Sequence, residues 1–163
     1  MYDCRTMDRY PMTLEGHAAL TAELKQLISI ERPKISKEIG VAREHGDLRE
    51  NAEYHAAKEK QGMIEARIAH IEGVISRADV IDTSQMKGGR VKFGARVTLE
   101  DCDTGEKRTL RIVGPEEADI SKGTVSVTAP IARACINHEV GDEVKVAAPA
   151  GTRTYEIAEI AWT

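Results

Sequence analysis

Residues 54–78 read YHAAKEKQGMIEARIAHIEGVISRA, and their apolar spacing predicts the structure of the N-terminal half. Positions along this stretch recur alternately at three and four residues, which is the heptad spacing of a coiled coil. These positions are Tyr54, Ala57, Gln61, Ile64, Ile68, Ile71, Ile75 and Ala78. A helix of about 30 residues is roughly 45 Å long. We therefore expect one long helix that extends beyond a compact body.

A second apolar stripe lies upstream. Its members also recur at three and four residues: Leu20, Leu24 and Leu27, then Ile35, Ile39 and Ala42. Thr13 precedes the stripe, and its hydroxyl suits a helix N-cap. Pro33 separates the two groups, and a proline inside a helix removes one backbone hydrogen bond, so we expect a kink or a break there. Two stripes joined by a few residues predict an antiparallel helical hairpin.

The turn of this hairpin carries two acids. Gly46 suits the end of one helix and Asp47 the start of the next. Asp47 and Glu50 are three residues apart, which places two carboxylates on one helix face, where they can hold one hard cation. The same spacing fits a capping box, and the local pattern alone favours capping. Because Mg²⁺ takes about six oxygen ligands, a metal site here needs ligands from another molecule.

The pattern changes after Asp82. Residues 83–90 are polar and contain Gly88-Gly89, so they read as a linker. Alternating apolar residues predict a strand over 91–99. Further strands are expected at 107–113, 124–127, 143–146 and 154–161, with a short helix at 130–136. The fold class is therefore α+β: a coiled-coil hairpin over 11–82, a linker over 83–90, and a small, mostly antiparallel β domain over 91–163. Residues 1–10 are expected to be a disordered extension, with Met7 an alternative start.

Composition limits the function further. The 163 residues carry a net charge of −4, whereas a protein that grips bare nucleic acid relies on Lys and Arg. The three cysteines, Cys4, Cys102 and Cys135, show no CxxC spacing, which fits a reducing cytoplasm. No apolar run of about 18 residues predicts a membrane span, and no signal peptide is expected.

Several separated motifs resemble one family. The stretch 41–57, VAREHGDLRENAEYHAA, is similar to the hairpin tip of the Gre family of bacterial transcript-cleavage factors. Five further segments resemble the same family in the same order, so the resemblance covers residues 11–162: Pro11-Met12-Thr13, Arg32-Pro33, Phe93-Gly94, residues 111–114 (RIVG) and residues 130–134 (PIARA). Ala129 departs from a common Ser, and Asn137-His138 replaces a frequent Gly-Lys.

The resemblance implies a mechanism. A Gre hairpin enters the secondary channel of bacterial RNA polymerase when the nascent RNA 3′ end has backtracked into it. Asp47 and Glu50 would then help to bind a second Mg²⁺, shared with the polymerase, and orient a water. The factor is not an enzyme and has no cofactor of its own. It stimulates the intrinsic endonucleolytic activity of the polymerase, which rescues arrested complexes.

The resemblance also assigns supporting residues. Those facing the RNA or supporting the tip would be Arg43, Asn51, Tyr54 and Lys58. The C-terminal domain would have an FKBP-like fold and dock at the channel rim through Ser126, Thr128, Ala129 and Pro130. We expect a monomer. Three alternatives remain: an inhibitor that binds the same channel, a prolyl isomerase suggested by the FKBP-like shape, and a coiled-coil adaptor whose acids only cap a helix.

Overall fold

The computed structural model describes residues 9–47 and 50–162, which form two compact units. One unit is His17–Ala78. The other joins Asp79–Thr163 to the N-terminal residues up to Gly16. Our predicted boundaries placed residues 11–16 with the hairpin. In the structure they lie in the C-terminal unit, where the Thr13 amide and hydroxyl both donate to the Glu117 carboxylate.

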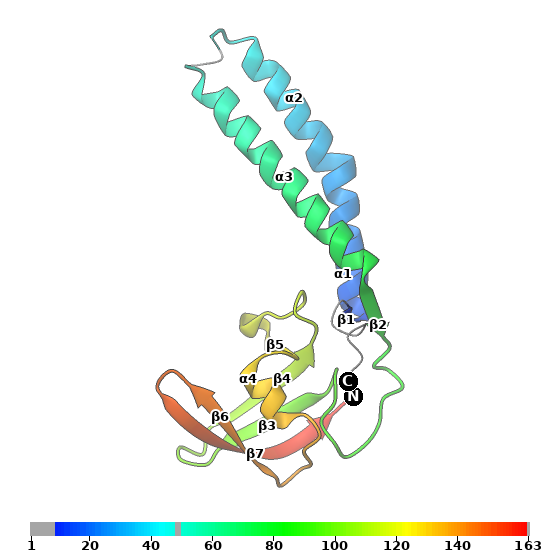
Figure 1. Ribbon diagram of the computed structural model, residues 1–163, viewed down its shortest axis with the longest axis vertical. Helices are drawn as coiled ribbons and strands as arrows, with labels where there is room; N and C mark the ends of the chain where they lie inside the picture. The colour runs from blue at the N-terminus through cyan, green and yellow to red at the C-terminus, as the bar shows by residue number, and fades with distance from the viewer. Residues whose placement is uncertain (1–8, 48–49, 163) are drawn as a thin grey trace. The chain divides into compact units, whose positions relative to one another are not determined.

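The first unit is the predicted helical hairpin. Its elements are α1 (Leu14–Gln26, which begins in the other unit), η2 (Leu27–Glu31), α2 (Arg32–Arg43) and α3 (Ala52–Ser76). Figure 1 shows α2 and α3 side by side and antiparallel. Their shared core consists of Ile35, Ile39, Ala57, Ile64 and Ile68, with Leu24, Leu27 and Tyr54 packed against it. The predicted stripes of both helices therefore face each other.

The predicted break at Pro33 is confirmed, and it takes the form of a π-helical stretch. The chain stays helical, but the Arg32 amide donates to the Leu27 carbonyl, five residues back. Pro33 follows directly and has no N–H to donate, so the normal α-helical ladder is interrupted here in any case. The seam of α3 also ends earlier than predicted. Val74 is buried in the last turn, and Ala78 begins a strand instead of extending the heptads.

The second unit contains a five-stranded sheet in the order β5-β4-β3-β7-β6. Only the β4–β5 pair is parallel. Apolar side chains from the sheet and from α4 form most of the core. Figure 1 shows α4 beside the sheet. The elements are β3 (Arg96–Asp101), β4 (Lys107–Val113), the 3-10 turn η3 (Ile120–Lys122), β5 (Thr124–Ser126), α4 (Pro130–Cys135), β6 (Glu143–Ala148) and β7 (Gly151–Ala161). The predicted α+β class is confirmed.

The strand predicted over 91–99 is partly wrong, because β3 begins only at Arg96. Residues 91–95 form a turn instead. The Gly94 amide donates to the Ile112 carbonyl, and the Ala95 amide donates back to Lys92. Gly94 has φ +86°, a conformation that glycine adopts without strain. Val91 and Ala95 are nevertheless buried, so the alternating apolar residues in the sequence correctly indicated burial but not a strand.

A two-stranded sheet of β1 (Tyr10–Thr13) and β2 (Ala78–Ile81) was not predicted from the sequence. Tyr10 therefore does not belong to the predicted extension, of which residues 1–8 lie outside the described residues. The predicted N-cap is confirmed, since the Thr13 hydroxyl accepts from the Gly16 amide at 3.0 Å. No helix among the described residues has the length and apolar character needed to cross a membrane.

Glu117 anchors the N-terminal strand to the loop after β4. Its carboxylate accepts from the Thr13 amide and the Gly114 amide, each at 3.0 Å, and from the Thr13 hydroxyl. The backbones approach closely here, because a Cβ on Gly114 would overlap the carbonyl oxygen of Pro11. One side chain thus satisfies donors from segments that are about 100 positions apart.

We expect Glu117→Ala to lower the free energy of unfolding of this unit by about 2–4 kcal/mol, because it leaves buried amides without an acceptor. Trp162 is the only tryptophan and lies in this unit, so its fluorescence during urea unfolding measures the effect. Glu106→Ala, at an exposed turn position, is the control. Equal stability of the two variants would contradict the anchoring role.

The hairpin carries two bidentate ion pairs between its helices. Arg32 Nε lies 2.8 Å from Glu65, and Arg67 Nε lies 2.7 Å from Glu23. The hydrogen bonds from these guanidinium groups lower the pKa of both carboxyls below the usual 4.5. The pairs are 40–47% exposed, so each contributes little.

A lowered carboxyl pKa stabilises the folded state above the unfolded pKa, and this contribution is lost as the pH falls. We therefore expect the melting temperature of the hairpin, followed by far-UV circular dichroism, to drop between about pH 5 and pH 3. The double variant Glu23→Gln/Glu65→Gln should lose part of this pH dependence. An unchanged pH profile would show that the pairs contribute nothing.

Candidate functional site at the hairpin tip

Asn51 organises the tip. Its Oδ1 accepts from the Tyr54 amide at 3.1 Å, which makes it the N-cap of α3. Its Nδ2 donates to the Ala42 carbonyl near the end of α2 at 2.6 Å. One side chain therefore starts the second helix and ties it to the last turn of the first. The loop between them is held at both ends.

The capping interpretation of Asp47 and Glu50 is wrong. The N-cap is Asn51, and both acids precede α3 in the loop. The expectation that they share a helix face fails for the same reason. An amide suits the N-cap here because it accepts from the Tyr54 amide and also donates to Ala42, whereas a carboxylate only accepts. The two acids are thus not needed to start α3.

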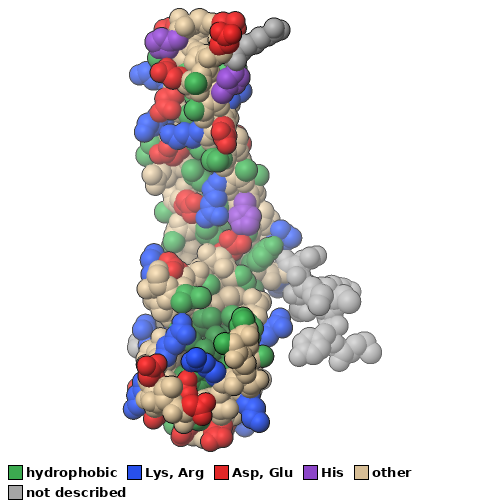
Figure 2. Space-filling view, turned by 90° about the vertical axis from the view of Figure 1, so that its left-hand side faces the viewer, with side chains coloured by type: hydrophobic (Ala, Val, Ile, Leu, Met, Phe, Trp, Pro, Cys, Tyr) green, Lys and Arg blue, Asp and Glu red, His purple; other side chains and the backbone are tan. Residues whose placement is uncertain are grey.

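Both acids are exposed and line one open hollow of about 500 Å³. Its other lining residues are His45, Asn51, Ala52 and Glu53. Figure 2 shows acidic and histidine side chains gathered at this end of the hairpin. Within the described ranges, no group of three or more His, Cys, Asp or Glu residues is arranged to hold a metal ion. Magnesium binding by Asp47 and Glu50 stays a prediction that requires further ligands.

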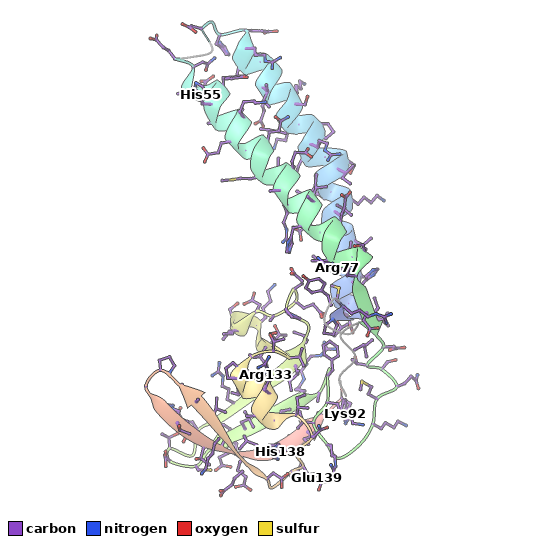
Figure 3. The ribbon with its side chains drawn as sticks, viewed as in Figure 1. His55, Arg77, Lys92, Arg133, His138 and Glu139 are labelled. Atoms are coloured by element: carbon purple, nitrogen blue, oxygen red, sulfur yellow. The ribbon has the colours of Figure 1, made fainter. Side chains whose placement is uncertain are left out.

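The residues predicted to support the tip lie around Asn51. The Arg43 guanidinium lies 5.9 Å from the centre of the Tyr54 ring, within cation–π range. The Tyr54 ring meets His55 edge-on at 5.6 Å, and His55 lies near the start of α3 (Figure 3). Lys58 lies further along and bonds Gln61 at 3.2 Å. The structure thus brings Arg43, Asn51 and Tyr54 together, and contact with RNA stays a prediction.

The predicted docking segment lies in the other unit, between β5 and α4. The Thr128 amide donates to the Ser126 hydroxyl at 3.1 Å, and the two hydroxyls lie 2.7 Å apart. Ala129 is the N-cap of α4 but offers no side-chain cap, and Pro130 occupies the first turn. Ser126 is half-buried, whereas Thr128 and Pro130 are exposed. Docking through this segment stays a prediction.

The cavity between the sheet and α4 does not offer the pocket that prolyl isomerisation needs. The cavity between the sheet and α4 measures about 10 Å³, too small for a proline ring. It is lined by aliphatic residues and Cys135, whose burial raises its pKa to about 11. This cavity therefore gives the isomerase alternative no support.

Comparisons with known proteins identify the family. The model for the N-terminal domain of transcription elongation factors matches residues 10–80, and the GreA/GreB C-terminal model matches residues 85–161. The chain belongs to the GreA/GreB family of transcription elongation factors. It is 58% identical to transcription elongation factor GreA of Hyphomonas neptunium, over 96% of this chain and 99% of that protein. It is 57% identical to GreA of Ruegeria pomeroyi, over 96% of this chain and the whole of that protein.

Solved structures are also similar to this chain. GreA factor homolog 1 of Thermus thermophilus is 27% identical, over 94% of this chain and 99% of that chain, with a TM-score of 0.43. The GreA/GreB factor of Nitrosomonas europaea is 19% identical, over 94% of this chain and all of that chain, with a TM-score of 0.42. Family membership makes this chain a transcription elongation factor and confirms the resemblance found in the sequence.

We expect Asn51→Ala to destabilise the hairpin by about 1–2 kcal/mol, because it removes a cap and an interhelical bond. Asn51→Asp should keep the cap but lose the bond to Ala42, so its effect should be smaller. Thermal unfolding by circular dichroism and hydrogen exchange at the Tyr54 amide measure the two contributions. Unchanged hydrogen exchange at the Tyr54 amide in Asn51→Ala would show that the cap contributes nothing.

Proposed function

We propose that this protein enters the secondary channel of bacterial RNA polymerase with its hairpin tip leading. There it stimulates cleavage of the backtracked RNA 3′ end and so rescues arrested complexes. One observation carries the proposal: Asp47 and Glu50 are exposed in a loop whose two ends Asn51 holds in place. Carboxylates presented in this way can complete a site on another molecule.

The chemistry divides between two proteins. A pair of Mg²⁺ ions can stabilise both the attacking and the leaving oxygen of phosphodiester hydrolysis. Asp47 and Glu50 would supply oxygen ligands to the ion that the polymerase holds incompletely, and would accept a hydrogen bond from the attacking water. Arg43 would lie on the path of the extruded RNA. The factor alone has too few ligands, so it stimulates the polymerase and is not itself an enzyme.

Most of the affinity would come from the polymerase. A net charge of −4 gives the whole chain little attraction for RNA by itself. We infer that Ser126, Thr128, Ala129 and Pro130 dock at the channel rim, since Thr128 and Pro130 are exposed in the turn before α4. We also infer that the factor binds as a monomer.

We expect Asp47→Asn/Glu50→Gln to reduce cleavage of backtracked RNA by about 100-fold or more, because neutral amides bind a cation poorly and stabilise charge less. Affinity for the polymerase should stay within about twofold, since the change lies at the tip and not at the rim. A cleavage assay on halted elongation complexes, paired with a binding measurement, gives both values.

Glu59→Gln is the matched control, because Glu59 is an exposed acid on α3 outside the hollow. Undiminished cleavage by the double variant would refute the role of the acids. Repression of elongation by the wild-type factor would instead identify a channel inhibitor. Failure of the wild-type protein to bind polymerase would favour the adaptor alternative.

A further inference from the structure

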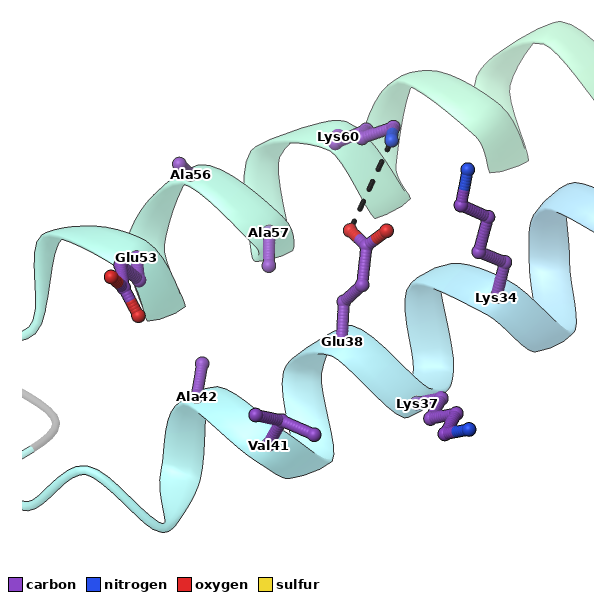
Figure 4. A pocket seen from close by; sticks show the side chains of 9 residues that line it. All are labelled: Lys34, Lys37, Glu38, Val41, Ala42, Glu53, Ala56, Ala57 and Lys60. Carbon is purple, nitrogen blue, oxygen red and sulfur yellow. Dashed lines mark ion pairs between the residues drawn. The ribbon is translucent and has the colours of Figure 1, made fainter.

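A second hollow lies between α2 and α3, behind the tip. It measures about 560 Å³, which is within the range of ligand pockets, roughly 300–1,000 Å³. Most of its exposed lining is apolar, although Lys and Glu side chains also line it (Figure 4). Its lining, here called the hairpin groove, consists of Lys34, Lys37, Glu38, Val41, Ala42, Glu53, Ala56, Ala57 and Lys60.

Small side chains create this groove. Ala42 and Ala57 point into the space between the helices (Figure 4), whereas isoleucines such as Ile39 and Ile64 fill the seam further from the tip. Protein interiors are normally close-packed, so a hollow bounded by methyl groups leaves dispersion contacts unmade. Val41 on its edge is 49% exposed. An apolar side chain from a partner would fill this space and cover Val41.

The charges around the groove favour an acidic partner. Lys60 spans the groove to Glu38 at 3.9 Å, so these two charges largely offset each other (Figure 4). Within the described residues, neither Lys34 nor Lys37 has a hydrogen-bond or ion-pair partner. Glu53 lies at the other end of the groove, next to the tip. Two unpaired cations beside an apolar floor would attract carboxylates next to an apolar side chain.

The groove suits a protein segment better than RNA. Unpaired bases bind mainly by stacking on aromatic rings or Arg planes, and the lining contains neither. Lys34 also lies nine residues before the end of α2 at Arg43, which corresponds to about 14 Å along the helix. At that distance behind the tip, the Lys34 end of the groove would face the channel wall instead of the RNA 3′ end, whereas the Ala42 end adjoins the tip.

We propose that the hairpin groove docks an acidic segment of RNA polymerase that inserts one apolar side chain between α2 and α3. This inference rests on the proposed function, because it supplies the contact that would hold the hairpin inside the channel. The tip acids would then set cleavage, while the groove would add to the affinity that docking at the rim supplies.

The test compares two groove variants with matched controls. Val41→Glu places a carboxylate in the groove, and Met63→Glu makes the same kind of change at an exposed position outside it. Lys37→Glu reverses a groove charge, and Lys25→Glu reverses an exposed charge on α1. Circular dichroism melts of all four variants verify that the hairpin is folded. Affinity is measured for core polymerase without RNA and for a backtracked complex.

We expect both groove variants to bind both polymerase forms roughly tenfold or more weakly, and the controls to stay within about twofold of wild type. Cleavage at saturating factor should equal wild type, because the tip is intact. If the wild-type factor is active but the groove variants bind as well as their controls, the groove proposal is overturned and the proposed function is not. Weakening only in the backtracked complex would identify RNA as the occupant and also overturn it. A wild-type factor that neither binds nor stimulates cleavage would overturn the proposed function itself.

Discussion

The Asn51 side chain joins the two helices where the chain reverses, and the geometry of the tip depends on it. Its carbonyl oxygen caps α3 and its amide group bonds the Ala42 carbonyl, so the two helix ends are fixed relative to each other. The aliphatic seam holds the helices together along their length, but it cannot orient the loop beyond Arg43. Only with both ends held can a short loop present Asp47 and Glu50 in a limited set of positions.

The sequence predicted those features that depend on periodicity. The apolar stripes through Ile35, Ile39, Ile64 and Ile68 predicted the hairpin, because the spacing of helix-packing residues is a local pattern. Pro33 predicted the break in the α-helix, because proline changes the backbone hydrogen bonds of its own turn. The β4 strand also matched its predicted bounds. Asn137 has φ +67°, a conformation that asparagine tolerates better than most residues, so its replacement of a common glycine preserves the turn after α4.

Other features depend on long-range contacts that no local pattern contains. Glu117 lies in an ordinary loop sequence, yet its partners Thr13 and Gly114 make β1 part of the C-terminal unit. The turn at 91–95 has the alternating apolar sequence of a strand, because other segments bury Val91 and Ala95. At the tip, two residue types competed for the N-cap. Asn51 is the N-cap and Asp47 is not, because the Asn51 side chain can also donate a hydrogen bond to α2, which lies alongside in the folded hairpin.

The position of the acids also has an electrostatic basis that is independent of function. The N-terminus of α3 carries a partial positive charge, which favours Glu53 in its first turn and Glu50 just before it, while Arg43 suits the C-terminal turn of α2. These effects are worth less than about 1 kcal/mol each at exposed sites. Helix electrostatics can therefore explain why the fold tolerates acids at the tip, but the fold does not require them. Replacing them should thus hardly alter folding, so a large loss of cleavage with unchanged stability and binding would reflect chemistry.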